Sequence, residues 1–104
     1  MNEGMSSGWV GILSAELHFP EAHSLKEKRM SVRSAKEQLR NRFGAAVAEV
    51  DHHDLWQRTR LTVAVVTRDA ADAERLLSEA ERYLSSREWE VALVERELVT
   101  LDDE

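Results

Sequence analysis

The chain has 104 residues, a net charge of −6 and no cysteine. This length suits one domain with a single hydrophobic core, and a hydrophobic fraction of 42% argues against disorder. The absence of cysteine excludes disulfides, thiol catalysis and cysteine-based zinc sites. No apolar run has the length of a membrane span, and no signal peptide precedes the first apolar segment, so we expect a cytoplasmic protein.

The chain is expected to begin with a flexible leader and a strand. Residues 1–8 contain several small residues, which is typical of a flexible segment. From Trp9 to Phe19, apolar and polar side chains alternate, which predicts a strand with one buried face and one wet face. Pro20 should end this strand, because proline cannot donate to a sheet ladder.

The segment from Ser24 to Gly44 is predicted to form an amphipathic helix with a signal at each end. Ser24 and Glu27 have the spacing of a capping box, and Gly44 suits the left-handed position after the last turn. The apolar residues that fall on one helical face are Leu25, Val32, Ala35, Leu39 and Phe43.

A basic stripe follows one flank of this helix. Its members, at steps of three and four residues, are Lys26, Arg29, Arg33, Lys36 and Arg40. Residues 25–42 hold seven Lys or Arg against two Glu, which gives a local charge of +5 and leaves −11 for the rest of the chain. Such polarity can orient a partner. The stripe is either a solvated flank whose long stems cover the edge of the core or a surface for phosphates.

Two more strands, a second helix and a last strand follow. Residues 46–51 and 61–66 alternate, which predicts two strands joined by a hairpin connection. Asp69 is a suitable N-cap for a second amphipathic helix. Alternation returns from Trp89 and fades near Val99.

The order βαββαβ predicts a ferredoxin-like α+β fold. Right-handed crossovers place both helices on one face of a four-stranded antiparallel sheet. This single domain would span residues 9–99 and precede an acidic tail at 100–104. The opposite, open sheet face would stay wet or form a homodimer. Its expected members are Ser14, Glu16, His18, Val47, Glu49, Thr62, Ala64 and Val66.

The hairpin connection holds the one dense group of potential metal ligands or acid–base residues, namely Asp51, His52, His53 and Asp54. Adjacent side chains diverge, and the group matches no familiar metal or catalytic-triad spacing. We therefore expect no metal, no cofactor and no catalytic residues. A metal-dependent or hydrolytic enzyme that uses Asp51, His52 and Asp54 stays open as an alternative.

Trp56 lies in the same connection. Its side chain either folds back onto the sheet edge or faces a partner, and we expect the folded-back position. Arg58 beside it would suit a polar rim around a contact.

Several segments resemble the YlxP-like family, small bacterial proteins classed as a domain of unknown function. The segments are residues 24–29, 42–43, 48–52 and 54–58, and the resemblance runs from about Val10 to Leu98. It implies a ferredoxin-like fold. It also implies a setting near the ribosome, because family members are often encoded beside translation initiation factor two and ribosome-binding factor A. It transfers no catalytic residues.

We therefore expect a non-enzymatic accessory factor of ribosome assembly or translation that binds ribosomal RNA or a ribosomal partner. The basic stripe would contact phosphates, with Trp56 and Arg58 as a second contact. The alternatives are the enzyme described above and a homo-oligomeric small-ligand or regulatory module that uses the open sheet face.

Overall fold

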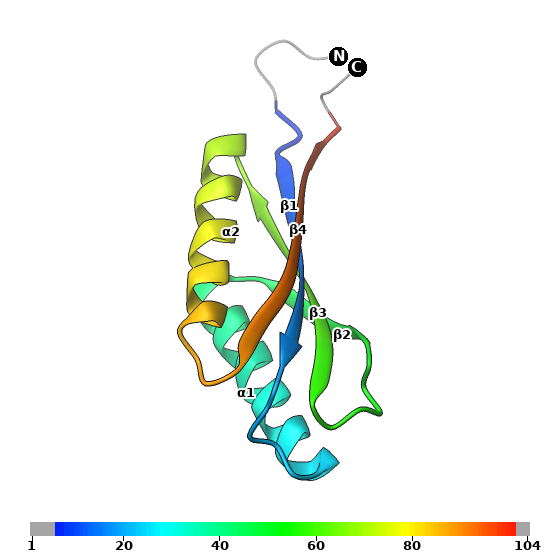
Figure 1. The fold of residues 1–104 in the computed structure, drawn as a ribbon. Coiled ribbons are helices and arrows are strands. Elements are labelled where there is room, and N and C mark those ends of the chain that lie inside the picture. Colours follow the sequence, from blue (N-terminus) through cyan, green and yellow to red (C-terminus); the bar gives the residue numbers. More distant parts are fainter. Residues whose placement is uncertain (1–5, 102–104) are drawn as a thin grey trace.

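Four antiparallel strands form one sheet in the order β2-β3-β1-β4 in the computed structural model, which describes residues 6–101. The elements are β1 (Trp9–His18), α1 (Leu25–Phe43), β2 (Ala46–Asp51), β3 (Arg58–Thr67), α2 (Ala70–Ser85) and β4 (Glu90–Thr100). Both helices lie on the same side of the sheet (Figure 1). The predicted ferredoxin-like α+β fold is confirmed.

The first and last strands pair along their whole length. Trp9 lies opposite Thr100, and the Thr100 hydroxyl donates to the carbonyl oxygen of Gly8 at 2.8 Å. Strand β4 therefore ends one residue beyond the predicted domain limit. The predicted flexible leader and acidic tail fall mainly on residues 1–5 and 102–104, which lie outside the described residues.

Helix α1 begins and ends at the predicted residues. The Ser24 side chain accepts the N–H of Glu27 at 3.2 Å. The Glu27 carboxylate accepts the N–H of His23 at 2.6 Å, one residue earlier than in the predicted capping box. Gly44 adopts a left-handed φ of 62°, and its N–H donates to the Arg40 carbonyl oxygen at 3.0 Å. These caps fix the helix from which the basic stripe projects.

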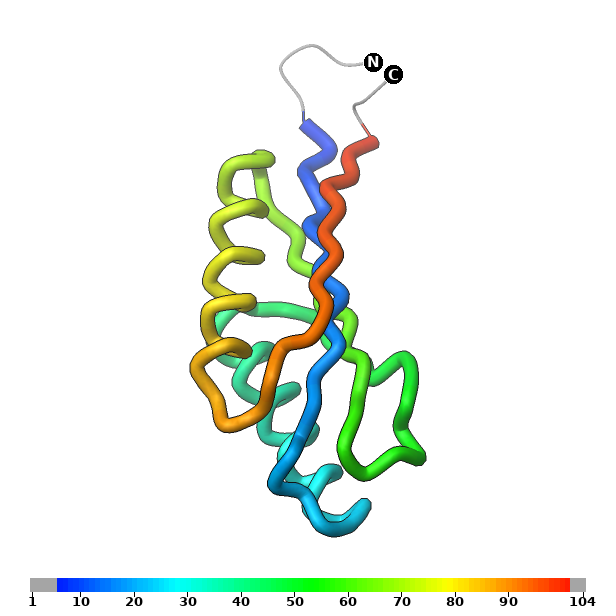
Figure 2. Tube along the Cα trace, in the orientation of Figure 1, coloured from blue at the N-terminus to red at the C-terminus, as the bar shows by residue number. Residues whose placement is uncertain are grey.

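The core lies between the sheet and the helices. Helix α1 packs on β2 and β3, whereas α2 packs on β1, β3 and β4. Figure 2 shows that the helices follow one another along the sheet, with α2 toward the start of β1 and the end of β4. No helix within residues 6–101 is both long and apolar enough to cross a membrane. The largest apolar side chains that are fully buried are Leu13, Leu17, Leu39, Leu61, Leu77 and Leu84.

Strand β2 presents the face opposite to the one predicted. Val47 lies opposite Val63 and is buried, whereas Ala46 and Ala48 are exposed. Residues directly opposite one another on antiparallel strands point to the same face. Val47 and Glu49 therefore face the helices, and their predicted place on the open face is wrong. Ala46, Ala48 and Val50 make one side of this strand entirely apolar, whereas Val47 shares the other side with Glu49. The pattern by itself therefore favours the wrong side, and only the pairing with β3 selects the buried one.

Two register shifts change which side chains reach the open face. The β2–β3 pairing shifts between Glu49 and Asp51, so Val50 has no opposite residue. The β1–β4 pairing shifts between residues 16 and 17, which places Leu93 on the open face opposite Glu16. An extra residue in one strand bends it and re-aims the side chains that follow. The first shift directs Asp51 toward the open face at the start of the hairpin loop.

Candidate functional site

The basic stripe lies on the flank of α1 beside β2, which is an edge strand. Arg40 donates from Nη2 to the Val47 carbonyl oxygen on β2 at 3.3 Å. On the other flank, the guanidinium of Arg42 lies 5.0 Å from the ring centre of Tyr83 on α2. The stripe therefore faces away from α2. Its members are exposed except for Lys36, which is half-buried.

The cations of the stripe differ from some of those near α2 in having no carboxylate partner among residues 6–101. Among residues 6–101, no ion pair joins a stripe cation to a carboxylate, whereas Arg75 and Arg96 on the α2 side are both paired. From Lys26 to Arg40 the helix rises by about 21 Å. The five charges therefore form an extended surface that could neutralise several phosphates of one strand.

Lys28 belongs to the same helix but is fully buried. Its Nζ lies 2.7 Å from the Glu49 carboxylate and 2.9 Å from the His52 carbonyl oxygen. Thr59, also buried, donates its hydroxyl to Glu49. Burial by itself would raise the pKa of Glu49, but the hydrogen bonds from Lys28 and Thr59 and the charge of Lys28 outweigh it and lower that pKa. This ion pair joins α1 to β2.

The burial of Lys28 was not predicted from the sequence, although a signal for it exists. It follows Leu25 by three residues and precedes Val32 by four, so it sits on the apolar face of the helix. A lysine at that position must find a buried partner, because an unpaired buried charge is costly.

The hairpin loop, residues 52–57, is held at its first residue. His52 adopts a left-handed conformation with φ 63°. Its N–H donates to the Asp51 carboxylate at 2.8 Å. Its carbonyl oxygen accepts from Lys28 and also from the N–H of Leu55, at 3.0 Å. The start of the loop is therefore tied to both α1 and its own turn.

The end of the loop is held as well. The Gln57 side chain donates to the Ala22 carbonyl oxygen at 3.4 Å, and its own carbonyl oxygen accepts the N–H of Phe19 at 2.8 Å. Between these anchors, Leu55 and Trp56 remain 44% and 48% exposed. The expected folded-back position of Trp56 is therefore wrong.

On the open sheet face, four cationic or ionisable side chains lie close to the Glu16 carboxylate. Arg58 donates to its carboxylate, and His52, His18 and Arg60 lie 3.3, 3.5 and 3.9 Å away. The hydrogen bond from Arg58 is the main cause that lowers the pKa of Glu16 to about 2, against the opposing effect of burial. The charge of Arg58 and hydrogen bonds with His18 and His52 add to it. Arg58 is therefore engaged within the protein.

The structure brings His52 Nδ1 within 3.7 Å of the Asp51 carboxylate, but it does not bring Asp54 to them. The His52 ring turns toward Glu16, while the Asp54 side chain is 84% exposed. The described part of the chain has no group of three His, Asp or Glu side chains placed to hold a metal ion. Asp51 instead stabilises the start of the hairpin loop, because its carboxylate accepts the backbone N–H of His52.

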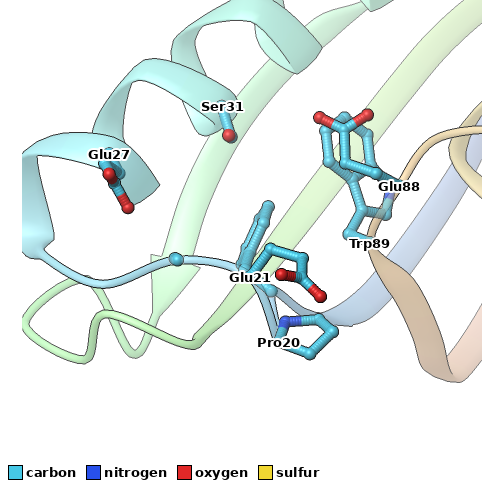
Figure 3. A pocket seen from close by; sticks show the side chains of 8 residues that line it. Pro20, Glu21, Glu27, Ser31, Glu88 and Trp89 are labelled. Atoms are coloured by element: carbon cyan, nitrogen blue, oxygen red, sulfur yellow. The ribbon is translucent and has the colours of Figure 1, made fainter.

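A pocket of about 220 Å³ lies near the start of α1. Glu27 and Ser31 come from α1, whereas Glu21 and Trp89 come from the segments after β1 and before β4 (Figure 3). With Glu88, three carboxylates line it. This charge disfavours an anionic ligand, so the pocket does not extend the stripe as a phosphate surface.

The Lys28–Glu49 pair should dominate the stability of this region. Lys28→Met should lower the free energy of unfolding by about 3–5 kcal/mol, because it leaves Glu49 uncompensated. Lys28→Met with Glu49→Gln should lower it by less than the sum of the single changes, with a coupling of about 1–3 kcal/mol in urea unfolding. The matched control is the exposed pair of Arg75 and Glu79, whose coupling should be about 0.5 kcal/mol or less. Additive effects at Lys28 and Glu49 would contradict this role.

Glu16 should contribute a pH-dependent part of the stability. Its pKa falls from 4.5 to about 2 on folding, so its contribution is present above about pH 4.5 and is lost as the pH falls toward 2. Urea unfolding of the wild type and of Glu16→Gln should therefore show a difference at neutral pH that shrinks across this acid range. A difference that stays constant with pH would show that the Glu16 carboxylate is not held in its charged form by these partners.

Comparison with known proteins identifies the family. Residues 10–98 match the model of the family described as "Protein of unknown function (DUF503)". The uncharacterized protein YlxP of Bacillus subtilis (strain 168) is 29% identical over 90 residues, which cover 77% of this chain and 98% of that protein. Among solved structures, the de novo designed protein Ferredog-Diesel aligns over 93% of this chain and 91% of its own, with 14% identity and a TM-score of 0.41. The family match covers most of the chain and confirms the resemblance inferred from the sequence, and the chain therefore belongs to the DUF503 family of unknown function.

Proposed function

We propose that this protein is a non-enzymatic accessory factor that binds ribosomal RNA through the basic stripe during ribosome assembly or translation. The observation that supports the proposal is the stripe itself. Its five cations follow one helix flank, and no carboxylate within residues 6–101 pairs with them. Cations that are already paired inside a protein have less to gain from phosphates than unpaired ones.

The charge distribution also favours one orientation of the RNA. The chain outside residues 25–42 has a net charge of −11 and repels a polyanion. RNA would therefore approach the flank of α1 beside β2 and avoid most other surfaces. This separation limits indiscriminate binding while leaving the stripe available.

The ribosomal setting comes from the family resemblance, in which neighbouring genes encode translation factors. Of the two further contacts expected from the sequence, Trp56 is exposed, whereas the Arg58 guanidinium is paired with Glu16. We therefore assign Arg58 to holding the open sheet face and Trp56 to the partner side.

A second candidate is a homo-oligomeric regulatory module that uses the open sheet face. Val66 is 77% exposed there, opposite Val10, which in turn lies opposite the exposed Val99. Apolar side chains at one end of a sheet could pair across a two-fold axis.

Light scattering should then give twice the mass of 11.9 kDa, and Val66→Glu should restore the monomer. A dimer that persists in Val66→Glu would remove this face as the interface.

Neutralising three stripe cations tests the main proposal. The triple change Arg29→Gln, Arg33→Gln and Lys36→Gln should weaken RNA binding and flatten its salt dependence. For single-stranded RNA, the slope of log K against log salt concentration should fall by about 2, because each phosphate contact contributes about 0.7. Fluorescence anisotropy with a labelled RNA over a salt series measures this slope.

The matched control removes the same charge elsewhere, through Arg68→Gln, Arg75→Gln and Arg82→Gln near α2. Equal losses in both triple variants would show that net charge, and not the stripe, governs binding. The wild type should also co-sediment with one ribosomal subunit or its precursor, and the stripe variant should not. Absence of the wild type from every ribosomal particle at low salt would overturn the ribosomal part of the proposal.

A further inference from the structure

We infer that the RNA bound by the basic stripe is single-stranded, and that the hairpin loop stacks one of its bases on Trp56. This inference deepens the function proposed above and rests on it. It adds the class of RNA and a second mode of contact at the hairpin loop.

Trp56 is the most exposed aromatic side chain among residues 6–101, with Leu55 exposed beside it. An indole offers a large flat surface, and every nucleobase has a face that can stack on it. The other two tryptophans do not compete for this role, since Trp89 is buried and Trp9 is partly buried within β1. The exposed indole is therefore available to a base without any rearrangement of the core.

The loop that presents Trp56 is anchored on both sides. His52 is bound through its carbonyl oxygen by Lys28, and Gln57 bonds to Ala22 and Phe19. A loop that is already ordered has little conformational entropy left to lose on binding. The buried Lys28–Glu49 pair therefore does more than stabilise the fold, because it holds the stacking surface in place.

The loop and the beginning of the stripe lie at the same end of the molecule. Lys28, whose Nζ reaches the loop, sits between the stripe residues Lys26 and Arg29 in the first turns of α1. Figure 1 shows the β2–β3 hairpin and the start of α1 at the end opposite the start of β1 and the end of β4. A strand whose phosphates follow the stripe could therefore place a base at the loop.

The local charge favours a base over a phosphate at Trp56. Asp51 and Asp54 on either side of His52 and His53 are both exposed, and the cation of Arg58 is paired with Glu16. These carboxylates would repel a phosphate but not the face of a neutral base. A base can reach the indole only when it is not paired and stacked inside a duplex, which is why the inference specifies a single strand.

The test compares one labelled single-stranded RNA with the duplex that it forms with its complement, at low salt. Trp56→Ala should weaken binding of the single strand by about 5- to 150-fold, the range for the loss of one stacked base. Its binding to the duplex should not change. Trp56→Phe should retain most of the single-strand affinity, whereas Trp56→Leu, which is apolar but cannot stack, should behave like Trp56→Ala. Thermal unfolding checks that these surface variants stay folded.

The outcomes separate this inference from the proposed function. If Trp56→Ala binds both RNAs like the wild type while the stripe variant loses binding, the stacking inference is overturned and the proposed function stands. If Trp56→Leu is as good as Trp56→Phe, the contact is apolar and not stacking. If Trp56→Ala keeps RNA affinity but no longer co-sediments with ribosomal particles, Trp56 contacts a protein. If the wild type binds no RNA at low salt, both proposals fall.

Discussion

The ion pair between Lys28 and Glu49 is the interaction on which the rest of this surface depends. Lys28 is fully buried, so its ammonium group must keep Glu49 and the His52 carbonyl oxygen as partners. This requirement fixes the rotation of α1 about its axis. With Lys28 turned toward β2, the basic stripe on the adjoining flank of α1 faces solvent beside the edge strand. The direction of the basic stripe follows from a contact inside the protein.

Most of the other cations described in the domain form ion pairs within the protein. Arg58 pairs with Glu16 on the open face, Arg60 with Glu95, Arg75 with Asp72 and Glu79, and Arg96 with Glu81. The uneven charge along the sequence therefore becomes a difference between two surfaces. On the sheet and near α2, most cations are neutralised by ion pairs. Beside β2, the cations of the basic stripe have no such partners within the part of the chain that the structure describes. In the proposed function, a polyanion would approach the second surface, although the protein as a whole is acidic.

In the proposed complex, the RNA is bound by two neighbouring features, the basic stripe and the hairpin loop. The helix flank supplies charge for the backbone, and the anchored loop supplies a flat apolar surface for a base. Ferredoxin-like proteins that bind RNA through their sheet place aromatic side chains in the middle of strands. Here Glu16 and its partners occupy the open face where β1 ends and β3 begins, and the exposed indole lies in the hairpin loop. The same fold would therefore meet RNA from a different side.

Local patterns by themselves determined the order of the elements, the bounds of α1 and the spacing of the stripe. Caps such as Ser24 and Gly44 act within one helix turn, and helical periodicity needs no distant partner. Tertiary structure alone decided that Val47 is buried, that Trp56 is exposed, and that Lys28 meets Glu49 across 21 residues of chain. The alternation in β2 places Val47 on the same side as the charged Glu49, so only the pairing with β3 and the contact with Lys28 make that side the buried one. The partner of a buried charge is likewise set by folding, because residues far apart in sequence become neighbours only there.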